Sequence, residues 1–432
     1  MKRSASTFLL PLEIILMIVI GVAIALRFLL IARHELWYDE ALSILLSAGQ
    51  RLDYPPPTDI PRALSDYSQL LQVPVEKGLG DTIETVKNIL KSVLGDAHPP
   101  LFYLSQHVWM RLFGAGIVAQ RSLVVFTSIG TIGCGYGLGR VVLGHRGGLI
   151  LAALLATNPF FMAHSLNLRM YALMTFWAVL SQLLLLLLME YGKTARTYPV
   201  RPLWLGLAVA VAGGLSSQYL YAYSLMSLGL AVLVLGRRYW LRCGSAMAAG
   251  IVLVLPWTLW GTRQQANNRA DVLTQISVEG SPLTIAFRHF QDIAHTLANH
   301  LLLGHWTTGF PPYGENIKPA AVYVGIGVIV FLGFILWQLR QERRILVTGV
   351  VLGLVPLLIA LGIDILTNKF TLGFGWGRST IVALPGCLLL IASWLMTLRR
   401  WQQPVILGLL SLYLVMGVGS FVGRDRTIFR TI

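Results

Sequence analysis

Four short stretches of this 432-residue chain place charged side chains against apolar surroundings, and they are the candidates for chemistry. A carboxylate can remove a proton from a hydroxyl group as a general base. Arginine can hold a phosphate through two parallel N–H···O bonds and stabilise charge as the phosphate leaves. Together, such groups suit transfer from a phosphate to a hydroxyl. The residues are Asp39 and Glu40, then Asp96 and His98, then Asn167, Arg169 and Tyr171, and finally Arg378.

Each stretch also has a plainer explanation. Adjacent acids are often solvated loop charges, and the His98-Pro99-Pro100 sequence is typical of a rigid turn into a helix. Arginines near the end of a membrane helix can extend their head groups to the interface. Arg169 is the hardest to explain in this way, because residues 147–189 contain no other Lys, Arg, Asp or Glu. Ionisable residues at membrane depth are costly and are usually functional.

The composition predicts the elements that must position these residues. The chain is 55% hydrophobic and only 12% charged, so lipid must be its solvent. A membrane-spanning helix needs ~20 apolar residues, and the apolar runs predict an all-α polytopic membrane protein. The expected spans, about 11 in number, are 8–31, 119–139, 147–163, 171–189, 203–219, 220–235, 245–261, 319–338, 345–363, 379–397 and 404–422.

The distribution of positive charge predicts the orientation. Cytoplasmic loops of membrane proteins are enriched in Lys and Arg. If residues 99–118 stay outside as a juxtamembrane helix, every short inner loop is basic, and Glu190 and Glu342 are the only acids in all of these loops together. We therefore expect the N-terminus inside, the C-terminus outside and run 8–31 retained as an uncleaved span. The formal charge of +15 then reflects topology, and no nucleic-acid partner is expected.

This orientation collects the candidate residues at one surface. The large outer segments are 32–118, 262–318 and 364–378. Within the first, Asp81 is expected to begin an amphipathic helix that Gly95 ends, with Glu84 in capping-box spacing. The three cysteines lie in apolar runs and are interpreted as small buried side chains. They are Cys134, Cys243 and Cys387.

The ordered set of motifs resembles the GT-C membrane glycosyltransferases. It is similar to the family 39-like group containing the protein O-mannosyltransferases and the lipid A aminoarabinose transferase. The resemblance covers most of the chain, interpreted as a single transmembrane domain, 1–432. It rests on the order and spacing of motifs that are individually weak. They are Asp39-Glu40, the acid-x-His-Pro-Pro-Leu sequence at Asp96, "QRSL", "GHRGGLILAALLATNPFF", "LRMYAL" and the segment from Arg378 to "ALPG".

The resemblance implies a polyprenyl-phosphate sugar donor, a hydroxyl acceptor and an active site on the extracytoplasmic side of the cytoplasmic (inner) membrane. It also implies an inverting single displacement, with Asp39 as the general base and Glu40 as its neighbour. Arg169, Arg378 and Arg121 match basic residues near the donor phosphate, and His98 matches the histidine of the His-Pro-Pro motif.

The chain also departs from this pattern. Asn167 stands where many relatives have Glu, and Gln218 stands where many have a His. Both changes weaken the argument for a metal site, so no cofactor is assigned and a divalent metal ion is left open. The chain ends at "GRDRTIFRTI", and no soluble C-terminal domain is expected.

Two other functions remain open. A transporter or flippase would bind its substrate near the bilayer midplane, often at broken helices. A noncatalytic subunit of a membrane assembly would tolerate loss of Asp39 without any effect on a sugar product. The sequence names neither the sugar nor the acceptor.

Overall fold

The structure is a computed structural model that describes residues 11–34, 36–53, 67–191, 200–269, 280–304 and 319–422. These residues form helices and no β-strand. Among them, nine helical segments are long and apolar enough to cross a membrane. The prediction of an all-α polytopic membrane protein is therefore confirmed. The helices of these segments are α1 (Leu12–Leu30), α6 (Ile117–Thr157), α8 (Tyr171–Tyr191), α9 (Val200–Ser217), α11 (Trp240–Trp257), α15 (Pro319–Gln338), α16 (Arg343–Gly349), α17 (Val355–Thr367), α18 (Leu384–Thr397) and α19 (Gln402–Val422).

Helix α6 corresponds to two of the expected spans. It is 41 residues long, and Gly144 interrupts it with φ 81° and ψ −176°, a conformation that favours glycine. The two arms pack closely, because a Cβ added at Gly139 would lie only 2.8 Å from the Cα of Gly148. The shorter apolar helix α10 (Ala222–Leu235) fills another expected position. The total of eleven spans and the inside N-terminus stay predictions.

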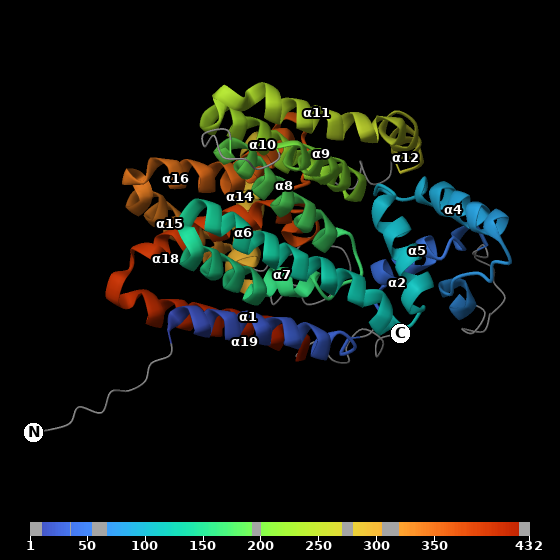
Figure 1. Ribbon diagram of the computed structural model, residues 1–432, viewed down its shortest axis with the longest axis horizontal. Helices are drawn as coiled ribbons and strands as arrows, with labels where there is room; N and C mark the ends of the chain where they lie inside the picture. The colour runs from blue at the N-terminus through green and yellow to red at the C-terminus, as the bar shows by residue number, and fades with distance from the viewer. Residues whose placement is uncertain are drawn as a thin grey trace, which may run out of the picture.

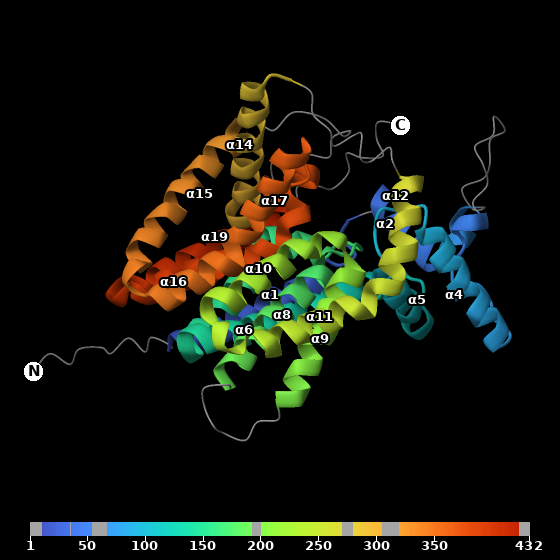
Figure 2. The same cartoon turned by 90° about the horizontal axis from the view of Figure 1, so that it is seen from above.

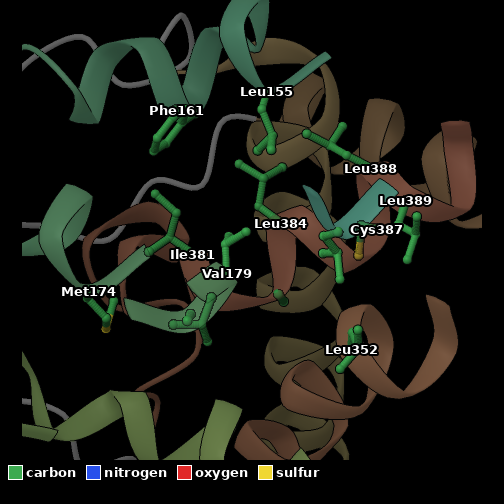
Figure 3. Packing of buried hydrophobic residues seen from close by; sticks show 14 of the residues in the cluster. Leu155, Phe161, Met174, Val179, Leu352, Ile381, Leu384, Cys387, Leu388 and Leu389 are labelled. Carbon is green, nitrogen blue, oxygen red and sulfur yellow. The ribbon is translucent and has the colours of Figure 1, made fainter. Parts of the chain in front are cut away.

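The centre of the bundle is built around the segment Gly377–Thr397, which includes α18 and in which 83% of the most apolar 18 residues are buried. Leu384, Cys387 and Leu388 from this helix pack beside Leu155 of α6 and Leu352 of the π-helix η8 (Val350–Leu354) (Figure 3). All three cysteines are free thiols. Cys243 and Cys387 are buried, as the apolar runs predicted, whereas Cys134 is only partly buried.

The long helical segment Arg237–Asn268 extends well beyond its expected span of 245–261. Its 32 residues measure ~48 Å, whereas the hydrocarbon core is ~30 Å thick. Its last part, α12 (Arg263–Asn268), reaches the outer segment in Figures 1 and 2. There, the side-chain amide of Gln265 donates to the carbonyls of Val93 (2.8 Å) and His98 (2.7 Å).

The described part of the first outer segment forms three α-helices of ten or more residues at one end of the bundle (Figure 1). They are α2 (Tyr38–Ser47), α4 (Leu79–Val93) and α5 (Leu101–Phe113). The juxtamembrane helix expected at Asp81 is present as α4, but it begins at Leu79 with Gly78 as N-cap. The capping-box prediction is therefore wrong: Asp81 accepts instead from the main-chain N–H of Lys77 at 2.8 Å.

Two more α-helices lie near the outer segments. Helix α7 (Pro159–His164) follows α6. It leads into the loop 165–170, here called the Arg169 loop, which ends where α8 begins. Helix α14 (Pro282–Ala298) continues into the π-helix η6 (Asn299–Leu303) and lies beside α15 in Figure 2.

Helix α5 occupies most of the stretch 99–118, and we predict that it does not cross the bilayer. Its 13 residues measure ~20 Å, which is too short for the hydrocarbon core. Single cysteines at Ala97 and Ala119, in a variant lacking Cys134, Cys243 and Cys387, should both react with an impermeant reagent applied from outside. Labelling from opposite sides would overturn the predicted topology.

Candidate active site

Helix α2 carries the acid pair in its first turn and is the next helix after α1, which ends at Leu30. Negative side chains are favoured there by the positive end of the helix dipole. Both acids are buried, Asp39 being 7% exposed and Glu40 fully inaccessible. Adjacent residues on an α-helix point ~100° apart, so the two carboxylates face different partners.

Glu40 forms a buried ion pair with Arg121 at the start of α6. Arg121 Nε donates to Glu40 Oε1 at 2.9 Å, and its Nη2 donates to Oε2 at 2.7 Å. Arg121 Nη1 also donates to the carbonyls of Ile31 and His34, both at 2.9 Å. Glu40 Oε1 accepts a third bond, from the main-chain N–H of Leu168 at 2.8 Å. The pair therefore ties α2 to the end of α1, to α6 and to the loop that carries Arg169.

Asp39 faces two other arginines. Arg378 Nη1 lies 3.2 Å from Asp39 Oδ2, and Arg169 Nε lies 3.9 Å from the same oxygen. Arg169 Nη1 also donates to the main-chain carbonyl of Asp39 at 3.3 Å and to Ser43 Oγ at 3.0 Å. Arg169 is only 4% exposed. One carboxylate thus contacts two guanidinium groups in a largely desolvated setting.

Asp96 supplies a second negative charge that interacts with Arg169. It accepts a hydrogen bond from the Tyr103 hydroxyl and lies 3.1 Å from His98 Nδ1. Burial alone would raise the pKa of Asp96, but the charges of His98 and Arg169 outweigh burial and hold the pKa below its ordinary value. Asp96 is therefore ionised at neutral pH and cannot serve there as a proton donor.

Two glycines shape the segment that delivers Arg378. Gly375 and Gly377 have φ of 59° and 86°, in the left-handed region. A Cβ at Gly375 would lie 2.2 Å from Arg378 Nε, so glycine lets this side chain fold back over its own main chain. The Arg378 guanidinium then lies 5.4 Å from the ring centroid of Tyr171. His300 supports the turn, with Nε2 2.8 Å from the Gly377 carbonyl.

The structure brings most of the sequence-predicted residues into one cluster. The Arg169 loop and Arg378 contact Asp39, Asp96 with His98 lies beside Arg169, and Tyr171 lies against Arg378. Asn167 is placed at the rim, where its Oδ1 accepts from Trp37 Nε1 at 3.2 Å. Arg121 stands apart, in the neighbouring pair with Glu40.

Sequence reasoning missed Tyr103, Ser43 and Gln265. Tyr103 follows Asp96 by seven residues, but its type alone gives no sign of a polar role. Ser43 follows Asp39 by one helical turn, and that spacing could have indicated a shared face. Gln265 is distant in sequence, and nothing in its surroundings indicates a contact with the His98 turn.

The second outer segment, 262–318, contains several histidines. Those that the structure describes are not arranged with their neighbours as a metal site. His295 is buried beside Asn299, and burial lowers its pKa to about 4. Asp292 is also buried, which raises its pKa to about 7. No group of three or more His, Cys, Asp or Glu side chains within the described ranges is arranged to hold a metal ion. His305 lies outside those ranges, and the divalent metal ion that the sequence left open stays a prediction.

Comparison with known proteins identifies the fold. A family model described as dolichyl-phosphate-mannose-protein mannosyltransferase matches residues 97–260. ArnT from Cupriavidus metallidurans bound to undecaprenyl phosphate matches with a TM-score of 0.56 and 14% identity, over 96% of this chain and 66% of that chain. Its apo form matches with a TM-score of 0.54 and 15% identity, over 90% and 61%. The chain has the GT-C fold.

A second GT-C protein gives the same result. The Archaeoglobus fulgidus oligosaccharyltransferase in complex with Zn and sulfate matches with a TM-score of 0.54 and 13% identity, over 93% of this chain and 53% of that chain. The chain thus spans about half to two thirds of the length of these GT-C structures. No curated protein was found to match its sequence.

The family match includes only part of the cluster of candidate active-site residues. Residues 97–260 contain His98, Arg121 and Arg169, whereas Asp39 and Arg378 lie on either side. The contacts of Asp39 with Arg169 and Arg378 are therefore an observation of this structure and are independent of the family model.

Proposed function

We propose that the protein is a glycosyltransferase that moves a sugar from a polyprenyl-phosphate donor to a hydroxyl acceptor at the outer membrane face. The observation that carries the proposal is the buried Asp39 carboxylate in contact with Arg169 and Arg378. The GT-C fold and the mannosyltransferase family match support it, as does the undecaprenyl phosphate bound to the ArnT of similar fold.

The donor phosphate is held by Arg169 and Arg378 in this mechanism. Guanidinium groups match phosphate oxygens in geometry and charge. In the structure these groups face Asp39. An arriving phosphate takes over part of their hydrogen bonding, which leaves the Asp39 carboxylate available to a hydroxyl. Tyr171 keeps Arg378 in place through contact with its guanidinium.

The transfer itself is a single displacement. Asp39 accepts the proton of the acceptor hydroxyl while the hydroxyl oxygen attacks the anomeric carbon. The bond from that carbon to the phosphate oxygen breaks, and its electron pair leaves with the phosphate. The two arginines stabilise the charge that develops there. Attack from the face opposite the phosphate inverts the configuration of the sugar.

Glu40 and Arg121 have a positioning role in this proposal. The sequence resemblance assigned Arg121 to the donor phosphate, but its guanidinium hydrogen-bonds to the Glu40 carboxylate and to two main-chain carbonyls. We therefore assign the pair to holding α2 against the Arg169 loop, which sets the direction of Asp39.

Transfer assays test the proposal directly. Purified full-length protein is incubated with a panel of labelled polyprenyl-phosphate sugars and with membrane-derived hydroxyl acceptors. Transfer of one sugar, with release of the polyprenyl phosphate, is the expected result. Movement of a labelled lipid across liposomes without any transfer would favour a flippase instead.

The arginines are predicted to control donor affinity. Arg169→Ala and Arg378→Ala should each weaken binding of the donor phosphate by about 10–100-fold, since a charge-assisted hydrogen bond contributes ~1.5–3 kcal/mol. Lysine at either position should restore binding only in part, because an ammonium lacks the planar fork. Affinity is measured by titration of a fluorescent polyprenyl-phosphate sugar.

Arg263→Ala is the matched control, since Arg263 is an exposed arginine on α12 near the same end of the bundle. Its donor affinity should equal that of the wild type. Normal donor binding by either the Arg169 or the Arg378 variant would remove that residue from the phosphate site.

A further inference from the structure

A polar cavity lies at the opposite end of α1 from the candidate active site. Its volume is about 380 Å³, at the lower end of the ~300–1,000 Å³ typical of small-ligand sites. It is lined by the start of α1, by Arg146 of α6, and by Arg399, Arg400 and Gln403. Helix α1 is 19 residues long, or ~28 Å, so the two sites lie near opposite ends of one helix.

The cavity carries an excess of positive charge. Arg146 forms an ion pair with Glu13, the only acid in the lining, at 2.6 Å. Neither Arg399 nor Arg400 has an acidic partner in the described part of the chain. The Arg400 guanidinium lies 5.5 Å from the ring centroid of Trp401. Two guanidinium groups are therefore available to an anion.

Two helices begin at the same place. Helix α1 starts at Leu12 and α19 at Gln402, and both residues line the cavity. The first N–H groups of a helix lack intrahelical partners and form its positive end, although at α19 the N–H of Gln402 already donates to the Arg399 carbonyl. A general enrichment of arginine at the inner surface explains basic loops, but it does not explain why arginines and two helix starts converge on one hollow.

The surroundings of the cavity indicate a lipid as the occupant. In the most apolar 18 residues of α1, only 22% of the residues are buried. In the corresponding stretch of the segment Arg399–Phe421, which includes most of α19, only 33% are buried. Met17 and Ile18 of α1 are 53% and 52% exposed, and Val415 of α19 is 67% exposed. These apolar faces offer a surface for acyl chains beside the arginines. Trp401, 59% exposed, is of the type that lies at the membrane interface.

We propose that this cavity binds the phosphodiester headgroup of an anionic phospholipid. Arg399 and Arg400 contact the phosphate, the two helix N-termini add to the positive potential, and the acyl chains lie along α1 and α19. Basic pockets between membrane helices are known to hold such headgroups. The site is independent of the proposed transferase reaction.

Short-chain phosphatidylglycerol tests the proposal on the purified full-length protein in detergent. Wild-type protein should bind it saturably and should bind phosphatidylcholine of the same chain length much more weakly. Arg399→Gln with Arg400→Gln should lower the phosphatidylglycerol affinity by about 10-fold or more, because both charge-assisted hydrogen bonds are lost. Arg400→Gln alone, at an exposed position, repeats the test if the double variant is poorly folded.

The matched control is Arg237→Gln with Arg238→Gln. This pair also lies in a 3-10 turn, directly before α11, but it does not line the cavity. Its phosphatidylglycerol affinity should be unchanged. Equal losses in both double variants would show only a generally basic surface, and equal binding of both lipids would exclude recognition of charge. Displacement of the lipid by inorganic phosphate at matching concentration would identify a free-anion site. Each of these three results overturns the proposal.

Discussion

Replacing Asp39 with asparagine is expected to lower turnover by about 10²–10⁴-fold, the usual contribution of general-base assistance. Phosphate is a good leaving group, so removal of the acceptor proton is the step that needs the protein. Asparagine keeps the size of the side chain but cannot accept that proton. Because it also removes the charge that Arg169 and Arg378 face, donor binding should not weaken. Single-turnover transfer and donor titration measure the two effects separately.

The control for Asp39 is Asp53→Asn, which changes an exposed acid in the same outer segment and should leave turnover unchanged. Full activity of Asp39→Asn would exclude this carboxylate as the base. An inactive Glu40→Gln beside an active Asp39→Asn would move the base by one residue.

The second large effect is expected on stability. Arg121→Ala or Glu40→Gln should lower the free energy of unfolding by ~3–5 kcal/mol, because each leaves one member of a fully buried ion pair without its partner. Denaturant or thermal unfolding in detergent measures the loss. The activity of the molecules that remain folded should fall less in Glu40→Gln than in Asp39→Asn, since Glu40 acts by positioning α2.

An exposed pair provides the comparison. Glu84 and Lys87 lie 3.6 Å apart on α4 with side chains 56% and 59% exposed, and Glu84→Gln should leave stability unchanged within error. Removing both buried charges together, as in Glu40→Gln with Arg121→Met, should recover part of the loss. A Glu40→Gln protein as stable as the wild type would contradict the positioning role.

The spans could be predicted because lipid imposes a length and an apolar composition on each helix, and both are visible in the sequence. The Asp39 cluster could be found for a related reason: a charge such as Arg169 has few tolerable environments in an apolar stretch. The separate roles of Asp39 and Glu40 could not be predicted. These roles depend on the direction in which each residue faces on α2, and hence on where the Arg169 loop and Arg121 lie.

The role of Arg121 also could not be predicted from the sequence. In the sequence it is one more arginine at the outer end of a span, like Arg169 and Arg378. The Glu40 carboxylate and the Ile31 and His34 carbonyls distinguish it in the structure, because they occupy the donors that a phosphate would use. Similarly, the start of α4 depends on the Lys77 to Asp81 bond, which residue types alone did not indicate.

Asp39 and Arg378 are separated by 339 positions in the chain. A ribosome adds ~5–20 residues per second, so roughly 20–70 seconds pass between synthesis of the acid and synthesis of its arginine partner. During that interval Asp39 has already left the ribosome, while the segment that carries Arg378 has not been made. The site is therefore completed late in membrane insertion, and a chain stalled before residue 378 cannot assemble it.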